Sequence, residues 1–299
     1  MQLSIIIVNY NSKLLLEQCI DSIKEAIQQL SCEIIVVDNN STDGSREYLP
    51  AKFTGVKFIF NDQNTGFAKA CNKGFKISSG QYILFLNPDT ILTKTCLTDC
   101  LSFFKAHPDA GAVGVRMVDG KQTFLKESKR GFPSPATSFY KLFGLASIFP
   151  GSKTFAKYYQ GHLPEKENNP VEVLSGAFIM IRREVFEKVN GFDEDFFMYG
   201  EDIDLSFRIG RSGYKNYYLG AINITHIKGG STTYDYKYVR DFYAAMKLFV
   251  KKHYSKKPAW FIFLLHTGIN LRKLMAMVRL VFPRTNTIRH IIVYSPRSS

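Results

Sequence analysis

The chain has 299 residues, of which 45% are apolar and 22% are charged, and this composition excludes an intrinsically disordered protein. Its length fits one large domain, or a core of about 230 residues with an appendage. Lys and Arg outnumber Asp and Glu by 39 to 26, which gives a net charge of +13.

The first 118 residues alternate short apolar runs with segments of helical periodicity. We predict strands over residues 3–8, 33–37, 56–60, 82–86 and 112–117, and helices over 14–27, from 45, over 67–78 and over 95–107. Strands that alternate with helices are typical of right-handed βαβ units and a parallel sheet. The first strand is followed by NYNSK, not by a glycine fingerprint or a P-loop, which disfavours dinucleotide dehydrogenases and P-loop enzymes.

Polar side chains stand at the ends of several predicted strands. Asn9 follows the first strand, Asp38 the second and Asp89 the fourth. Ligands of open α/β sheets bind at the carboxyl ends of the strands, and Pro88 stiffens the chain just before Asp89. We therefore predict a binding edge at these strand ends. The alternatives are structural: Asp89 and Thr90 would cap a helix, and Asp38 would cap an Asx turn.

Residues 120–169 show little periodicity and contain several Gly and Pro residues. A basic and aromatic run lies within them, from Lys126 through Arg130 to Pro133. We interpret this segment as a long excursion over a bound substrate, because long irregular stretches are usually functional or mobile. Strand-like runs resume at 171–174 and 177–181, and a helix is predicted over 183–189.

A second acidic cluster, GFDEDFFMYGEDIDLSFR, occupies residues 191–208. Glu201 and Asp202 follow a run of bulky residues and a glycine, which predicts a carboxylate at a helix N-terminus inside an aromatic-lined pocket. An ordinary helix start is the alternative, because acidic first turns complement the helix dipole. A further strand is predicted over 217–225, and His226 follows it. We predict that His226 lies near the functional site. The alternative is a structural histidine whose ring is hydrogen-bonded within the protein, which is the more common case for a lone histidine.

Several of these segments, taken in order, resemble the family 2 inverting glycosyltransferases, and most of all a bacterial rhamnosyltransferase-like branch whose members build cell-surface polysaccharide. The motifs are SIIIVNYNS, IIVVDNNSTDGS, NTGFAKACNKG, YILFLNPDT and SGAFIMIRREVFEKVNGFDEDFFMYGEDIDLSFR, followed by His226. The resemblance covers about residues 1–235 and is specific because the motifs occur in the expected order and spacing. It implies an α/β protein with the GT-A fold, a mainly parallel sheet flanked by helices, which here carries a C-terminal helical extension.

On the donor side, the resemblance implies binding of a nucleoside-diphosphate sugar. Asp38 looks like the carboxylate that contacts the nucleoside, and the loop at Asn9 lies beside it. The other donor contacts that the matching motifs imply are Asn64, Gly66, Asn72 and Asn87.

On the metal and acceptor side, Asp89 matches the last position of the family's DxD motif, and Asn87 replaces the first Asp. His226 matches a histidine that joins the metal shell in some members. Asp202, beside Glu201 in the family's ED pair, matches the catalytic base. The implied cofactor is Mg²⁺ or Mn²⁺, which neutralises the diphosphate leaving group, while the base takes the proton of the attacking hydroxyl.

The predicted activity is inverting transfer of a sugar from dTDP-rhamnose or a UDP-sugar to a saccharide or lipid-linked acceptor. A nucleotidyltransferase is the alternative enzyme class, although it is expected to carry a Gly-rich phosphate loop near its N-terminus. A non-catalytic sugar-binding scaffold is favoured if Asp89 and Asp202 do not converge. A glycoside hydrolase also uses two carboxylates but leaves Asp38 and the parallel sheet without a role.

We divide the chain into a catalytic domain and a basic tail. The domain covers residues 1–236, with a nucleotide-binding half over 1–118 and an acceptor half over 119–236. The tail, 237–299, holds 13 Lys or Arg residues and a single acidic residue, Asp241, so it carries +12 while the domain carries only +1.

Apolar residues recur at helical spacing over 238–252 of the tail, and a longer apolar run follows. That run, 260–282, is interrupted by His266, Arg272, Lys273 and Arg279. Burying a charge near the bilayer centre costs roughly 2.5–3.5 kcal/mol, so we predict an interfacial amphipathic helix and not a membrane span.

We expect the tail to hold a cytoplasmic protein peripherally on the inner face of the cell membrane. The alternative is a helical pair that packs on the catalytic domain, or on a second copy of the chain in a homodimer. Nucleic acid is disfavoured as a partner because no recognised binding fold accompanies the charge.

The cysteine pattern and the N-terminus fit this location. The five cysteines form no CxxC pair, have no His partner at zinc-ligand spacing and are odd in number, so we expect reduced thiols. The segment LSIIIVNYN begins at Leu3, and neither a charged n-region nor a long apolar core precedes it, so we expect no signal peptide.

Overall fold

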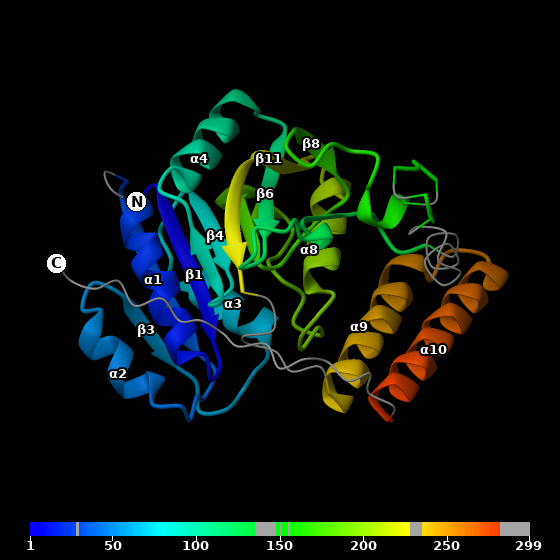
Figure 1. The fold of residues 1–299 in the computed structure, drawn as a ribbon, viewed down its shortest axis with the longest axis horizontal. Coiled ribbons are helices and arrows are strands. Elements are labelled where there is room, and N and C mark those ends of the chain that lie inside the picture. The colour runs from blue at the N-terminus through cyan, green and yellow to red at the C-terminus, as the bar shows by residue number, and fades with distance from the viewer. Residues whose placement is uncertain (28–29, 135–147, 150, 155, 228–234, 282–299) are drawn as a thin grey trace.

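The computed structural model describes residues 1–27, 30–134, 148–149, 151–154, 156–227 and 235–281 (Figure 1). The predicted Gly-rich loop at 228–233 and the end of the tail at 282–299 lie outside these residues. The architecture is α/β, as predicted, and helices cover both faces of one large sheet.

Nine strands form the large sheet in the order β3-β2-β1-β4-β10-β6-β11-β5, with β8 paired to β11. Their bounds are β1 (Leu3–Asn9), β2 (Cys32–Asp38), β3 (Lys57–Phe60), β4 (Tyr82–Leu86), β5 (Thr90–Leu92), β6 (Ala110–Val118), β8 (Asn168–Val171), β10 (Phe178–Arg182) and β11 (Lys215–His226). A small second sheet joins β7 (Lys129–Arg130) to β9 (Val173–Leu174).

The helices fall where the periodicity predicts them, within a few residues. Their bounds are α1 (Lys13–Ile27), α2 (Ser45–Lys52), α3 (Phe67–Lys76), α4 (Cys96–Ala106), α7 (Arg183–Lys188), α8 (Glu201–Arg211), α9 (Tyr236–Tyr254) and α10 (Ala259–Val281), with the short 3₁₀ turns η1 (Lys126–Ser128) and η2 (Lys157–Tyr159).

β1 is buried along its whole length because its apolar side chains fill two separate cores. Leu3, Ile5 and Ile7 pack in one core with residues of α1 and α4. Ile6 and Val8 pack in the other with residues of α3, α7 and α8. The continuous apolar run in the sequence therefore indicates a strand that is covered on both faces, as expected for the parallel part of a sheet.

The sheet is mainly parallel but contains one antiparallel strand at its centre. β1 pairs in parallel with β2 and β4, as predicted. β10 runs antiparallel between β4 and β6, so the chain returns to the middle of the sheet after the excursion. β5, where we predicted no strand, pairs antiparallel with the end of β11.

The excursion over 120–169 is tied down by a buried lysine. Lys129 is 2% exposed, and its ammonium group donates to the carbonyl oxygens of Gln160 and Leu163 at 2.7 Å each. These bonds replace the water that the charge loses on burial. They fix β7 and the segment around η2 to each other at one side of the sheet.

The first half of the predicted tail packs on the rest of the protein. Phe249 and Ala245 of α9 are buried in a third core with Val173, Phe196 and Ile203. α10 packs along α9, and the two helices lie side by side in Figure 1. The packed pair that we considered as the alternative to a membrane-bound tail is therefore present, whereas the domain boundary at residue 236 stays a prediction.

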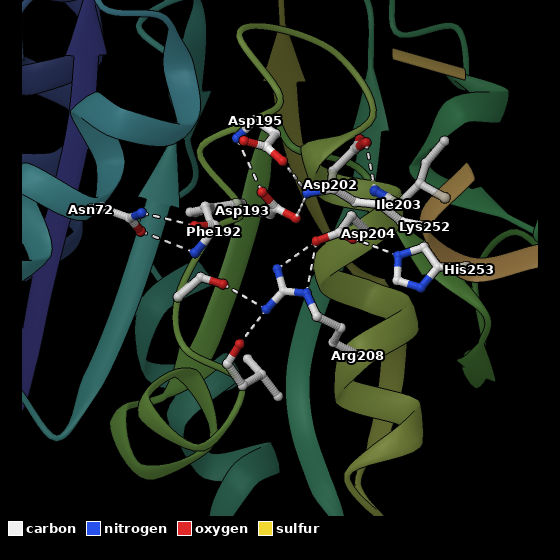
Figure 2. A network of polar contacts seen from close by, with 12 residues as sticks. Asn72, Phe192, Asp193, Asp195, Asp202, Ile203, Asp204, Arg208, Lys252 and His253 are labelled. Carbon is white, nitrogen blue, oxygen red and sulfur yellow. Dashed lines mark hydrogen bonds and ion pairs between the residues drawn. The ribbon is translucent and has the colours of Figure 1, made fainter. Parts of the chain in front are cut away.

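A buried ion pair fixes α9 to α8 (Figure 2). Asp204 is fully buried, accepts from Nε of Arg208 at 2.7 Å and lies 2.6 Å from Nε2 of His253 on α9. Burial alone would raise the pKa of Asp204, but the bond to His253 and the charge of Arg208 lower it overall. Lys252 pairs with Asp193 and Asp195 beside this contact.

Replacement of His253 tests how strongly this contact holds α9. We expect His253→Ala to lower the free energy of unfolding by about 1–3 kcal/mol, because it removes one partner of a buried carboxylate. Urea unfolding measures the change. Lys251→Ala, at an exposed position of the same helix, is the matched control. Equal effects of the two substitutions would contradict the assignment.

Candidate active site

Backbone pairing brings Asp89 and His226 together. Asp89 follows β4 and immediately precedes β5, and β5 pairs with β11 so that Thr90 lies opposite His226. Ile227 N donates to Asp89 O at 2.8 Å just past this pairing. As a result, His226 Nε2 lies 3.2 Å from Asp89 Oδ1, and the two side chains are 12% and 3% exposed.

Asp202 lies at the N-terminus of α8 and is held from two sides. A guanidinium nitrogen of Arg130 on β7 donates to its Oδ2 and also to Leu174 O at 2.9 Å. Gly176 N donates to the same carboxylate oxygen at 3.1 Å. Burial would lower the pKa of Arg130, but the charge of Asp202 raises it overall, so the guanidinium is a fixed positive charge.

Asp89 and Asp202 line one cavity of about 400 Å³. His226, Glu201 and Arg130 also line it, so its polar wall comes from the segment between β4 and β5 and from β7, β11 and α8. The rest of the wall is largely aromatic or thioether: Phe67, Met198, Tyr199, Tyr238, Phe242 and Met246. The predicted convergence of two distant carboxylates in an aromatic-lined pocket is therefore present, and α9 supplies part of the wall.

Glu201 differs from Asp202 although the two are adjacent in the chain. It is 7% exposed, and burial, followed by the charge of Asp202, raises its pKa from 4.5 to about 8. Its Oε2 has no hydrogen-bond partner among the described residues. A neutral carboxyl group with an unused oxygen can donate a hydrogen bond into the cavity, which Asp202 in its ion pair does not do.

The donor set beside the cavity fits a divalent cation only in part. Asp89 offers carboxylate oxygen and His226 offers imidazole nitrogen, and Nδ1 of His226 is buried without a partner in the described part of the chain. No group of three or more His, Cys, Asp or Glu ligands occurs among the described residues. Mg²⁺ usually takes one or two carboxylates together with substrate phosphates, so this pair suffices if a diphosphate completes the shell.

Asn9 and Asp38 lie side by side at the ends of β1 and β2. Both are buried, and Asn9 Nδ2 donates to Asp38 Oδ2 at 2.8 Å. Ser41 N donates to Asp38 Oδ1 at 2.9 Å, which is the turn cap that we considered as the alternative. Neither residue lines the cavity that contains Asp89, so their predicted contact with a nucleoside stays a prediction.

Asn64 and Gly66 shape the loop that enters α3. Asn64 Oδ1 accepts from Gly66 N at 3.0 Å. Gly66 has a φ of +84°, and a Cβ there would lie 2.3 Å from Phe197 O, so only glycine fits. Phe67 N donates to that same oxygen at 2.8 Å, which holds Phe67 in the cavity wall. The structure thus gives this motif a positioning role.

The two remaining predicted donor contacts have different surroundings. Asn72 joins α3 to the loop before α8, because its Nδ2 donates to Phe192 O at 2.8 Å and its Oδ1 accepts from Phe192 N at 3.0 Å (Figure 2). Its amide is used within the protein and does not line the cavity. Asn87 lines the cavity and is half-buried.

The sequence analysis did not single out Arg130 as the partner of Asp202. Its only signal was the basic and aromatic run at 126–133. Tyr158 and Tyr159 of η2, which also line the cavity, lie in a segment without periodicity and gave no signal. All three come from the excursion, so the segment borders the cavity that we expected it to cover.

Comparison with known proteins gives family matches over most of the described sheet. The model of a family described as Glycosyl transferase family 2 matches residues 4–189. A second model, described as the N-terminal domain of galactosyltransferase, matches residues 163–234 and therefore includes α8 and His226.

Among curated proteins, an N-acetylglucosaminyl-diphospho-decaprenol L-rhamnosyltransferase of Mycobacterium tuberculosis (strain ATCC 25618 / H37Rv) is 28% identical over 246 residues, 78% of each chain. Rhamnosyltransferase WbbL of Escherichia coli (strain K12) is 26% identical over 219 residues, 69% of this chain and 78% of its own. A solved structure of mannosyltransferase PcManGT from Pyrobaculum calidifontis, in complex with GDP-Man and Mn²⁺, superposes with a TM-score of 0.58 at 17% identity, over 95% of this chain and 76% of that chain. This last likeness shows a shared fold.

Replacement of Glu201 tests its raised pKa through stability. The group binds a proton more tightly in the folded state, so its contribution is complete below pH 4.5 and is lost as the pH rises through about 8. We expect Glu201→Gln to melt like the wild type near pH 4.5 and to be more stable above pH 8, by roughly 1 kcal/mol or more.

Thermal melts across this pH range measure the difference between variant and wild type. Glu184→Gln, at an exposed position of α7, is the matched control and should keep the wild-type pH dependence. A constant difference between Glu201→Gln and the wild type at every pH would mean that the pKa of Glu201 is the same in the folded and unfolded states, which would contradict the raised pKa.

Proposed function

The chain belongs to glycosyl transferase family 2, and from this premise we propose that it moves a sugar from a nucleoside-diphosphate donor to a hydroxyl of a saccharide or lipid-linked acceptor. The observation that carries this proposal is the shared cavity, in which Asp89 with His226 and Asp202 with Arg130 form two separate polar centres. One centre suits a diphosphate, and the other suits an incoming hydroxyl.

At the first centre, Asp89 and His226 would hold Mg²⁺ or Mn²⁺. When bound, such a cation neutralises the charge of a departing diphosphate. The mannosyltransferase complex with GDP-Man and Mn²⁺ supports this assignment, because a protein of the same fold binds both. Asn87, half-buried in the same wall, is placed to donate its side-chain amide to the donor.

At the second centre, Asp202 would act as the base. The acceptor hydroxyl loses its proton to a carboxylate oxygen of Asp202 as its own oxygen bonds to the anomeric carbon, and the bond to the diphosphate breaks on the opposite face. Configuration inverts because this is one in-line displacement. Arg130 and Gly176 N both bond Oδ2 of Asp202, so they fix the orientation of the carboxylate before the acceptor arrives.

The nucleoside would bind near Asn9 and Asp38, at the carboxyl ends of β1 and β2. Asn64, Gly66 and Asn72 would act on the donor through the loops that they hold. Both bacterial relatives are rhamnosyltransferases, which supports rhamnose as the sugar, from dTDP-rhamnose. The diphospho-decaprenol substrate of the mycobacterial relative supports a lipid-linked acceptor. Such a transfer would serve cell-surface polysaccharide synthesis. A UDP-sugar is the other donor within this proposal.

The roles of the two carboxylates are tested by isosteric replacement. We expect Asp202→Asn to lower the rate of transfer roughly 100- to 10,000-fold without weakening donor binding, because it removes only the base. We expect Asp89→Asn to weaken donor binding in the presence of Mn²⁺. Transfer to a soluble acceptor measures the first effect, and titration calorimetry with the donor measures the second.

Asp99→Asn, at an exposed position of α4, is the matched control and should change neither quantity. Normal turnover by Asp202→Asn would remove Asp202 from the base role. Loss of transfer and of donor affinity together in Asp202→Asn would assign it to donor binding instead.

α10 also supports binding to a membrane surface. Among the described residues, one segment, 259–278, is long and apolar enough to cross a bilayer when judged by length and composition alone, and 11% of it is buried in the structure. At about 100° per residue, its exposed apolar side chains fall within about 120° of one face. This apolar stripe consists of Trp260, Phe263, Leu264, Leu271, Leu274, Met275 and Val278. A one-sided stripe suits the plane of the membrane interface.

Charged replacements in the stripe test membrane binding without removing the buried part of α9. We expect Phe263→Glu combined with Leu274→Glu, positions that are 69% and 62% exposed, to lower binding to phosphatidylglycerol vesicles at least tenfold in flotation. The control is Leu14→Glu combined with Ile77→Glu, which are exposed apolar positions elsewhere. Unchanged flotation would end the membrane assignment, and a dimer that dissociates in the variant would assign the stripe to a second copy of the chain.

A further inference from the structure

A second, smaller cavity of about 90 Å³ lies between α9 and α10. Its lining, which we call the interhelical pocket, is almost entirely apolar. It includes Phe242, Met246 and Val250 from α9 and Leu265, Gly268 and Ile269 from α10. The packing of the two helices leaves this space beside a glycine, because Gly268 has no side chain to fill it.

The interhelical pocket adjoins the catalytic cavity. Tyr158, Phe242 and Met246 line both hollows, so the two spaces share part of their wall. The chemistry changes across this wall. The catalytic cavity has carboxylates, a histidine and an arginine, whereas the interhelical pocket has one charged residue in its lining, Arg272.

Arg272 is the charged residue of the interhelical pocket. It is half-buried, and its Nε is buried with no hydrogen-bond partner in the described part of the chain. Its charge also acts on Tyr159 of the catalytic cavity, where it opposes the burial that raises the pKa of that phenol to about 12. A guanidinium group with an unused buried donor, next to an apolar space, suits a ligand that is both anionic and apolar.

We propose that the interhelical pocket holds the sugar-proximal end of the hydrocarbon chain of a lipid-linked acceptor, while Arg272 pairs with the phosphate that joins this lipid to its sugar. This inference rests on the proposed function and adds the place where the acceptor lipid binds. The sugar then lies in the catalytic cavity with a hydroxyl toward Asp202. The exposed stripe on the other side of α10 would hold the helix pair at the bilayer from which such a lipid would enter.

Two acceptors separate the contributions of the lipid and the phosphate. Both carry the same saccharide, one on a long prenyl diphosphate and the other as a methyl glycoside without lipid or phosphate. The measured quantity is the ratio of kcat/KM for the lipid-linked acceptor to kcat/KM for the methyl glycoside. We expect Gly268→Leu, which fills the pocket, to lower this ratio about tenfold or more, because several buried methylene groups lose their site.

Asn270→Leu adds the same side chain at an exposed position of the same turn of α10 and should keep the wild-type ratio. Arg272→Gln should also lower the ratio about tenfold, because it removes the partner of the phosphate. Lys273→Gln, the adjacent residue outside the pocket lining, is its matched control. Vesicle flotation of all four variants is measured in parallel, so that a change in the ratio is separated from a change in membrane binding.

A ratio unchanged in both Gly268→Leu and Arg272→Gln, in a wild type that transfers sugar to both acceptors, would overturn the pocket while leaving the proposed function standing. Absence of transfer by the wild type to every acceptor and from every donor would overturn the proposed function itself. If Gly268→Leu does not fold by circular dichroism, the Arg272→Gln ratio decides the proposal alone.

Discussion

The central antiparallel strand is the constraint on which the candidate site depends. β10 lies between β4 and β6, so the turn at 175–177 before it comes to the exit of β4, where Asn87 N donates to Ala177 O at 3.0 Å. The neighbouring Gly176 N donates to the carboxylate of Asp202. One short turn therefore contacts the segment that carries Asp89 and the helix that carries Asp202. A chain that stayed at the edge of the sheet after residue 118 would not bring these two carboxylates into one cavity.

Each of the three carboxyl groups in the cavity has a different environment. Asp89 has His226 beside it and Asp202 has Arg130. Glu201 has no cation in contact among the described residues, and burial and the nearby Asp202 raise its pKa to about 8, so it is largely protonated near neutral pH. The cavity of about 400 Å³ can therefore hold both polar centres, because the carboxyl group of Glu201 is largely neutral near neutral pH and adds little negative charge.

The two C-terminal helices contribute both to the cavity, through α9, and to the exposed surface, through α10. α9 contributes Phe249 to a buried core, His253 to a buried ion pair and Tyr238 to the cavity wall. α10 rests on α9 and turns an apolar stripe outward. The two helices therefore link the wall of the catalytic cavity to the exposed apolar stripe of α10. Without α9, the wall of the cavity would lose three side chains, those of Tyr238, Phe242 and Met246.

The sequence by itself determined most of the elements, because burial on two faces leaves a continuous apolar run such as Tyr82–Leu86 and burial on one face leaves a helical period. It did not reveal the short strands β5 and β7. It also pointed to Asp89, Asp202 and His226, because their motifs resemble those of a known family. It did not reveal Arg130, nor that Asn72 bonds Phe192 across 120 residues of chain, because neither contact leaves a local pattern. Only the tertiary structure decided these two contacts, because strand order and register depend on pairings between distant segments of the chain. The partner of a side chain is then the residue that those pairings bring beside it.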